Sequence, residues 1–173
     1  MPRSYSAALP IAHVVLRILI VLNWLYGLAI IALLVALPNE QWIMVAFKIP
    51  PSPDAARLIM GLRAIALLGL AAVPLHYIVL KRLLAMVETV RAGDPFVAAN
   101  AQRLQTIAWA LVAQQILSLI IGVIVRVIST PAHPVNIDAG FSVNGWLAVI
   151  LTFVLARVFA EGALMRDDLE GTV

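Results

Sequence analysis

Four long runs of apolar residues alternate with short polar segments along the chain. The runs cover residues 11–37, 58–80, 104–128 and 146–160. A helix rises 1.5 Å per residue, so about 20 apolar residues cross a hydrocarbon core of roughly 30 Å. Backbone in lipid must satisfy its own hydrogen bonds, which runs of this length do as helices. The pattern predicts an all-α membrane protein, with residues 1–173 forming a single domain built as a four-transmembrane-helix bundle.

Composition supports a membrane protein and excludes several other classes. Hydrophobic residues make up 63% of the chain and charged residues 12%, whereas soluble domains carry about 25% charged residues. The absence of cysteine excludes disulfides, thiol catalysis and cysteine-ligated metals. The first run is longer than a signal-peptide core and no small-x-small cleavage site follows it, so we interpret it as a retained span.

The distribution of basic residues predicts the orientation of the spans. Basic residues accumulate beside cytoplasmic membrane faces. Most lie at the beginning of the chain, around residues 81–103 and around the C-terminal tail 161–173, at Arg3, Arg17, Lys81, Arg82, Arg91, Arg103, Arg157 and Arg166, whereas the other two loops hold only Lys48 and Arg57, with Arg126 at a span end. The bias predicts a multi-pass protein of the bacterial inner membrane with both termini and residues 81–103 in the cytoplasm.

The segment at residues 81–103 has the pattern of a helical hairpin. Its apolar positions keep a helical period up to Arg91, and Gly93 is a typical helix C-terminus. Asp94 followed by Pro95 suggests an N-cap and a proline in the first turn of the next helix. A helix over residues 57–92 would be about 54 Å long, which overshoots the hydrocarbon core. We therefore expect a cytoplasmic helical hairpin, with a plain extended linker as the alternative.

The two loops on the predicted extracytoplasmic side have the pattern of a small β flap. Residues 41–49 (QWIMVAFKI) and 135–143 (VNIDAGFSV) are rich in β-branched and aromatic residues and are bounded by turn-forming residues. The two segments could pair as a two-stranded flap.

The residue types missing from the spans argue against coupled transport and against catalysis. No run contains Asp or Glu, which argues against a proton- or sodium-coupled transporter. Soluble-enzyme motifs are missing, so we expect no enzyme, no cofactor, no metal and no direct contact with nucleic acid. His13 and His76 should lie near the inner membrane face, where facing imidazoles could hold haem; interfacial histidines are the favoured interpretation. Pro74 is the expected kink in the second span.

Two motifs carry a resemblance to a known family. Gly93-Asp94-Pro95-Phe96, Asn100 and Arg103-Leu104 match the pattern G-x-P-F-x-x-x-N-x-x-R-L. The end of the chain carries Val158-Phe159, Gly162, Leu164, an acidic cluster and a terminal Thr172-Val173. Together the motifs resemble the DUF2975 family of small four-span bacterial membrane proteins of unknown function. Its members are often encoded beside a small helix-turn-helix regulator, which implies a regulatory partner, and the resemblance brings no catalytic residue.

These motifs place a set of residues on one surface below the membrane. Phe96, Asn100, Arg103 and Leu104 fall at i, i+4, i+7 and i+8, on one face of the returning helix. Arginine–carboxylate pairing could dock the acidic tail onto this hairpin, although these residues could simply close the bundle end. The predicted partner-binding surface consists of Gly93, Asp94, Pro95, Phe96, Asn100, Arg103, Asp167 and Asp168.

The sequence therefore favours a membrane-anchored regulatory or partner-binding protein that acts through its hairpin and tail. A small-molecule transporter and a membrane haem or redox protein stay open as alternatives. The expected partners are the lipid bilayer and a helix-turn-helix regulator, and the pattern leaves homo-oligomerisation open.

Overall fold

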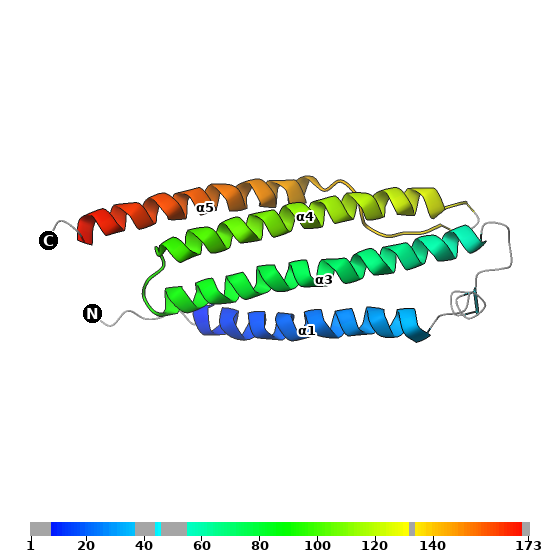
Figure 1. Cartoon of the computed structure of the whole chain (residues 1–173), viewed down its shortest axis with the longest axis horizontal. Coiled ribbons are helices and arrows are strands. Elements are labelled where there is room, and N and C mark those ends of the chain that lie inside the picture. Colours follow the sequence, from blue (N-terminus) through cyan, green and yellow to red (C-terminus); the bar gives the residue numbers. More distant parts are fainter. Residues whose placement is uncertain (1–7, 37–43, 46–54, 132–133, 171–173) are drawn as a thin grey trace. The chain divides into compact units, whose positions relative to one another are not determined.

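The computed structural model describes residues 8–36, 44–45, 55–131 and 134–170 (Figure 1). These residues form four long α-helices, which are α1 (Ala8–Ala36), α3 (Ala55–Arg91), α4 (Ala98–Ile128) and α5 (Val143–Glu170). Each helix is long and apolar enough to cross a membrane. The predicted all-α, four-span membrane protein is confirmed: the chain is a multi-pass membrane protein.

The helices extend beyond the apolar runs that predict them. Helix α3 has 37 residues and is continuous through Pro74, which makes it about 56 Å long. This agrees with the helix expected over residues 57–92. Helix α5 continues to Glu170, so residues 161–170, expected to form a polar tail, are the last turns of a helix.

Contacts divide the chain into two compact units. Unit 1 contains residues 8–23, 74–113 and 143–170 of the described chain, and unit 2 contains residues 24–36, 44–45, 55–73, 114–131 and 134–142. Helices α1, α3 and α4 each contribute one part to each unit, whereas α5 belongs to unit 1. The boundary in α3 falls at Pro74, a residue that lacks the N–H for the bond to the preceding turn.

Unit 2 is held together where the first turns of α3 meet the end of α4. Ala55, Leu58 and Ile59 form a buried cluster with Ile128. Gly61 lies so close to Ile128 that a Cβ at this position would overlap the isoleucine side chain. The absence of a side chain at Gly61 therefore allows α3 and α4 to pack closely.

The loop before α5 folds back along α4 within unit 2. Ser118 Oγ donates to the carbonyl oxygen of Gly140 and accepts from its N–H, each at 3.1 Å. A Cβ at Gly122, one turn further along α4, would lie 2.7 Å from Gly140 Cα. Gly140 has a φ of +127°, a conformation that residues with a side chain rarely adopt. Ser118 and Gly122 thus receive the backbone of the loop that precedes α5.

One of the two segments predicted to form the β flap, residues 135–143, lies in this loop and at the start of α5. Residues 135–142 contain no strand, and Val143 already begins α5. Their backbone bonds to two serine side chains instead. Gly140 bonds to Ser118 of α4, as described above, and the Val135 N–H donates to Oγ of Ser129, the residue after α4, at 3.1 Å. Within the other half, residues 41–49, only Met44 and Val45 are described, and both are helical; the remainder lies outside the described residues.

The buried apolar side chains of unit 1 lie on α4 and α5. They are small or aliphatic, namely Ala101, Leu104, Ile107, Ala108 and Ala110 of α4 with Val149, Ala156 and Ala163 of α5. Small residues at a helix interface let two backbones approach closely. Trp109 and Phe153 meet edge to face at 5.4 Å between ring centroids. The turn from α3 into α4 and the end of α5 belong to this unit.

Candidate functional site: the α3–α4 turn and the end of α5

Helix α3 ends in a Schellman motif centred on Gly93. The Gly93 N–H donates to the carbonyl of Val90 at 3.1 Å, and the Asp94 N–H donates to that of Thr89 at 3.0 Å. Gly93 has a φ of +87°, which glycine adopts without strain. The helix therefore stops where the sequence predicts, and the last carbonyls of α3 receive partners.

The start of α4 differs from the prediction. Residues 94–97 are not helical and α4 begins at Ala98, so the expected N-cap at Asp94 with Pro95 in the first turn is wrong. The Asp94 N–H is already used to close α3, and its carboxylate pairs with Arg166 of α5. Asp94 therefore ends one helix and contacts another, and the first turn of α4 forms four residues later.

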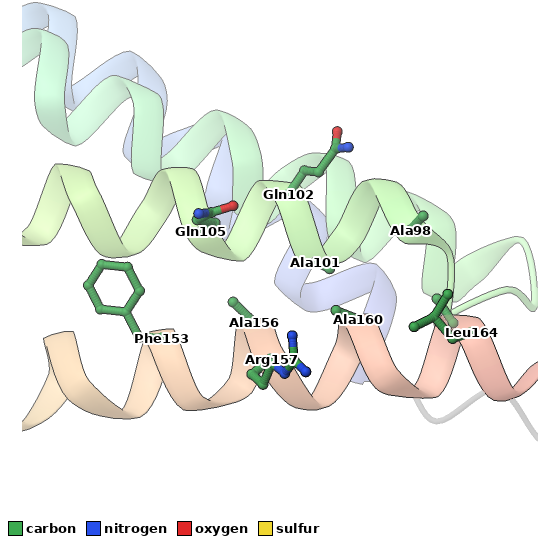
Figure 2. Close-up of a pocket in the computed structure, with 10 residues that line it drawn as sticks. Ala98, Ala101, Gln102, Gln105, Phe153, Ala156, Arg157, Ala160 and Leu164 are labelled. Atoms are coloured by element: carbon green, nitrogen blue, oxygen red, sulfur yellow. The ribbon is translucent and has the colours of Figure 1, made fainter.

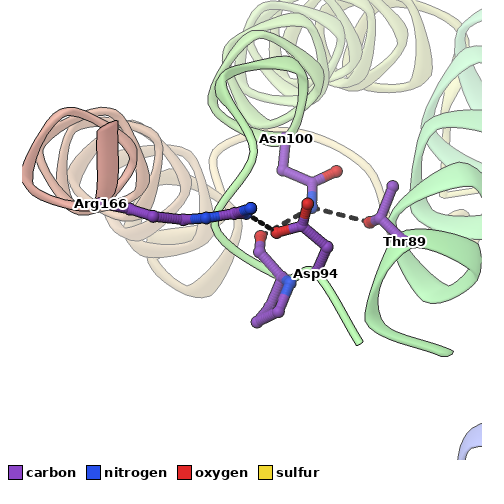
Figure 3. A network of polar contacts seen from close by, with 5 residues as sticks. Thr89, Asp94, Asn100 and Arg166 are labelled. Atoms are coloured by element: carbon purple, nitrogen blue, oxygen red, sulfur yellow. Dashed lines mark hydrogen bonds and ion pairs between the residues drawn. The ribbon is translucent and has the colours of Figure 1, made fainter. Parts of the chain in front are cut away.

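A buried asparagine links the two helices of the turn (Figure 3). Asn100 is 0% exposed. Its Nδ2 donates to Thr89 Oγ1 at 2.8 Å and to the Pro95 carbonyl at 2.9 Å. Thr89 Oγ1 in turn donates to the Met86 carbonyl at 2.7 Å. A buried amide costs free energy unless its donors and acceptor are satisfied, and here both N–H groups and the oxygen are bonded.

Arg103 completes this network. Its Nη1 donates to Asn100 Oδ1 at 2.7 Å and to the Ala85 carbonyl at 3.2 Å. Because a guanidinium can only donate, it also fixes the orientation of the Asn100 amide, with the oxygen toward Arg103 and the nitrogen toward Thr89. The predicted partner-binding residues Asn100 and Arg103 are thus brought together, but they join α3 to α4 inside the turn.

The ion pair between the turn and α5 has the opposite polarity to the expected one. Arg166 of α5 pairs with Asp94 of the turn (Figure 3). The two side chains are 40% and 39% exposed. The expectation was an arginine of the hairpin with carboxylates of the tail. Asp168 is exposed at the end of α5, and the side chain of Asp167 lies outside the described part of the chain.

An aromatic contact places the two sequence motifs against each other. The rings of Phe96 and Phe159 are 5.3 Å apart between centroids, tilted by 36°. A Cβ at Gly162 would lie 2.8 Å from Phe96 Cδ1, so the ring uses the space that glycine leaves on α5. Phe96 is nevertheless 44% exposed. The G-x-P-F motif therefore meets the Val-Phe and Gly motif of the chain end in space.

The turn and the end of α5 line a shallow, open hollow. It has a volume of about 360 Å³ and is lined by Ala92, Gly93, Asp94, Pro95, Phe96 and Arg166. The hollow offers a carboxylate, a guanidinium and an aromatic ring. This combination can recognise a protein surface by shape, charge and apolar contact.

The two described histidines that the sequence analysis singled out do not line the hollow. His13 is half-buried on α1, and His76 is exposed on α3. Among the described residues, no three His, Asp or Glu side chains come close enough together to hold a metal ion.

Sequence reasoning missed three residues of the site. Thr89 lies inside the helical run of α3, where nothing in the pattern separates it from other polar positions. The basic-residue pattern identifies Arg166 only as a sign of orientation, and the motif at the end of the chain contains Phe159 without indicating its partner. The spacing of Phe159 from Gly162, three residues along one helix face, is the signal that could have identified it as the partner of Phe96.

Comparison with known proteins agrees with the motifs. The family described as "Protein of unknown function (DUF2975)" matches residues 39–173. Neither curated proteins nor solved structures gave a significant match. The matched region covers most of the chain and includes α3, α4, α5 and the turn with its network. The chain therefore belongs to the DUF2975 family of proteins of unknown function.

Proposed function

We propose that the protein is a membrane-anchored regulator that binds a cytoplasmic partner protein. The interface we propose is the hollow around residues 92–96 together with Arg166. The observation that carries the proposal is the contrast between a rigid interior and an exposed rim. Asn100 is fully buried with all its polar atoms bonded, while the neighbouring Phe96 is 44% exposed.

Rigidity of this kind favours binding because less conformational entropy is lost when a partner docks. Ordering one rotamer-rich side chain on binding costs about 0.5–1.5 kcal/mol. Phe96 is already held by Phe159 and by the space at Gly162. Exposed aromatic and arginine side chains contribute disproportionately to the binding energy of protein interfaces. The proposal assigns the chain a binding role and no catalytic one.

The proposal places both termini and the turn in the cytoplasm of a bacterium, with the helices in its inner membrane. The support is the excess of Lys and Arg near the turn and the ends of the chain. Because the chain has no cysteine, single cysteines report orientation. Ala98 and Asn136 are both exposed. In intact cells, an impermeant thiol reagent should label Asn136→Cys and leave Ala98→Cys unlabelled. Labelling of Ala98→Cys from outside would overturn this orientation.

The family resemblance suggests which partner to test. Members are often encoded beside a small helix-turn-helix regulator, and we propose such a regulator as the partner. The test is the binding of the neighbouring regulator to the full chain in lipid nanodiscs, measured by interferometry. Ala92 is exposed and lines the hollow, so Ala92→Arg should block the hollow without touching the buried network. We expect at least a tenfold loss of affinity.

Ala99→Arg is the matched control, because Ala99 is exposed on the first turn of α4 and does not line the hollow. It adds the same charge and should leave the affinity unchanged. The proposal fails if the regulator does not bind the wild-type chain, or if the two variants lose affinity equally.

A further inference from the structure

A second cavity, separate from the turn, lies between α4 and α5 within unit 1 (Figure 2). It has a volume of about 490 Å³. Alanines of both helices form its floor, including Ala101 and Ala156, which are buried. Figure 2 shows Phe153 at one end and Leu164 at the other, near Ala98. Small side chains on facing helices therefore leave an apolar groove open along the pair.

The groove is about as long as one leaflet of hydrocarbon is thick. From Phe153 to Leu164 the helix advances 11 residues, about 16 Å. One leaflet of hydrocarbon is about half of 30 Å. The apolar run of this helix ends at Ala160 and polar residues follow. The groove therefore extends from the hydrocarbon across the level at which lipid head groups begin.

Polar groups line the groove beside its apolar floor. Gln102 and Gln105 on α4 and Arg157 on α5 contribute to its wall. Arg157 pairs with Glu161 on the next turn, and the two side chains are 77% and 43% exposed. An exposed guanidinium at a membrane interface attracts anionic head groups, and the long arginine side chain can reach toward the interface.

We propose that this groove binds an anionic phospholipid of the surrounding membrane. Arg157 contacts the phosphate, assisted by the Gln105 amide, and the first part of an acyl chain lies on the alanine floor toward Phe153. Lipid is favoured over a second copy of the chain because a helix packed into the groove would bury the Arg157–Glu161 pair. Removing such a pair from water costs more than a head group at the interface does. The proposal goes beyond partner binding at the turn and does not depend on it.

Native mass spectrometry of the detergent-solubilised full chain tests the proposal, with phosphatidylglycerol and phosphatidylcholine as the two probes. We expect the wild type to bind phosphatidylglycerol about fivefold more strongly, the effect of one basic residue at a lipid surface. Arg157→Gln should remove this preference. Glu161→Gln should increase it, because the guanidinium then has no competing carboxylate. Ala160→Leu should fill the groove and weaken the binding of both lipids.

Arg17→Gln is the matched control, since Arg17 is an exposed arginine on α1 and does not line the groove. It should leave the preference unchanged, as should millimolar inorganic phosphate. Equal binding of both lipids by the wild type, or the same loss in Arg17→Gln and Arg157→Gln, would overturn the proposal. A dimer of the wild type that Ala160→Leu dissociates would also overturn it, in favour of a second copy in the groove.

Discussion

Replacing Asn100 by alanine should open the turn between α3 and α4. The side chain is fully buried and takes part in three hydrogen bonds, to Thr89, to Pro95 and from Arg103. A neutral hydrogen bond contributes about 1 kcal/mol net, and a bond to a charged group about 1.5–3 kcal/mol.

The full sum is not lost, because two of the partners keep other bonds. Thr89 still donates to the Met86 carbonyl, and Arg103 still donates to the Ala85 carbonyl. We therefore expect the closed turn to lose about 3 kcal/mol of stability relative to the open one. Since 1.4 kcal/mol is a factor of ten, the opening equilibrium should shift on the order of 100-fold.

Amide hydrogen exchange measures this shift directly. The Gly93 and Asp94 amides are bonded only while α3 keeps its Schellman cap, so their exchange reports local opening. Thr106→Ala is the control, because Thr106 donates an exposed bond to the Gln102 carbonyl within α4; its effect should be about twofold.

Asn100→Asp separates the polar pattern from packing. The carboxylate keeps the shape and still accepts from Arg103, but it has no N–H for Thr89 or Pro95. We expect a loss similar to that of alanine. Wild-type exchange in Asn100→Asp, with fast exchange in Asn100→Ala, would refute the role given to the amide donors.

Three further substitutions test the close contacts. Gly162→Ala should cost about 1–3 kcal/mol by crowding the ring of Phe96, with recovery in the double variant Phe96→Leu, both read from thermal unfolding in detergent. Gly122→Ala should speed amide exchange in the loop before α5, because its Cβ would press on loop backbone that cannot rotate away. Asp94→Asn should cost only about 0.2–1 kcal/mol and less at high salt, because the Asp94–Arg166 pair is partly exposed. Exchanging the two charges should restore the unfolding midpoint.

The four helices could be predicted because long apolar runs leave the backbone only one solution in lipid. The length of α3 beyond its apolar run was predicted, whereas that of α5 was not. Residues 161–170 read as a tail because the apolar run ends at Ala160, yet α5 continues to Glu170. An apolar run ends where the membrane hydrocarbon ends. A helix can continue beyond that point when side chains one turn apart stabilise it, as Arg157 and Glu161 do in α5.

The sequence motifs identified part of the candidate site, but not Thr89, Arg166 or Phe159, and not how the side chains pair. The motif pointed to Asn100 and Arg103, but their partner Thr89 follows from how α3 and α4 align after the turn. The ion pair has the opposite polarity to the expected one, with Asp94 on the turn and Arg166 on α5, because its partners depend on how α5 lies against the turn. Side-chain partners across a turn depend on rotation and offset of two helices, which apolar periodicity does not fix.

The loop that returns along α4 has a consequence for the order of membrane assembly. Gly140 lies after Ser118 in the chain, and its N–H and carbonyl both bond to that one hydroxyl. During synthesis α4 is therefore made before the loop. It already carries the Ser118 hydroxyl, to which the later loop segment bonds. Helices that insert independently associate afterwards, and unpaired backbone groups are costly in hydrocarbon. Ser118→Ala should accordingly slow the acquisition of protease resistance by newly inserted chains while leaving the insertion of the four spans intact.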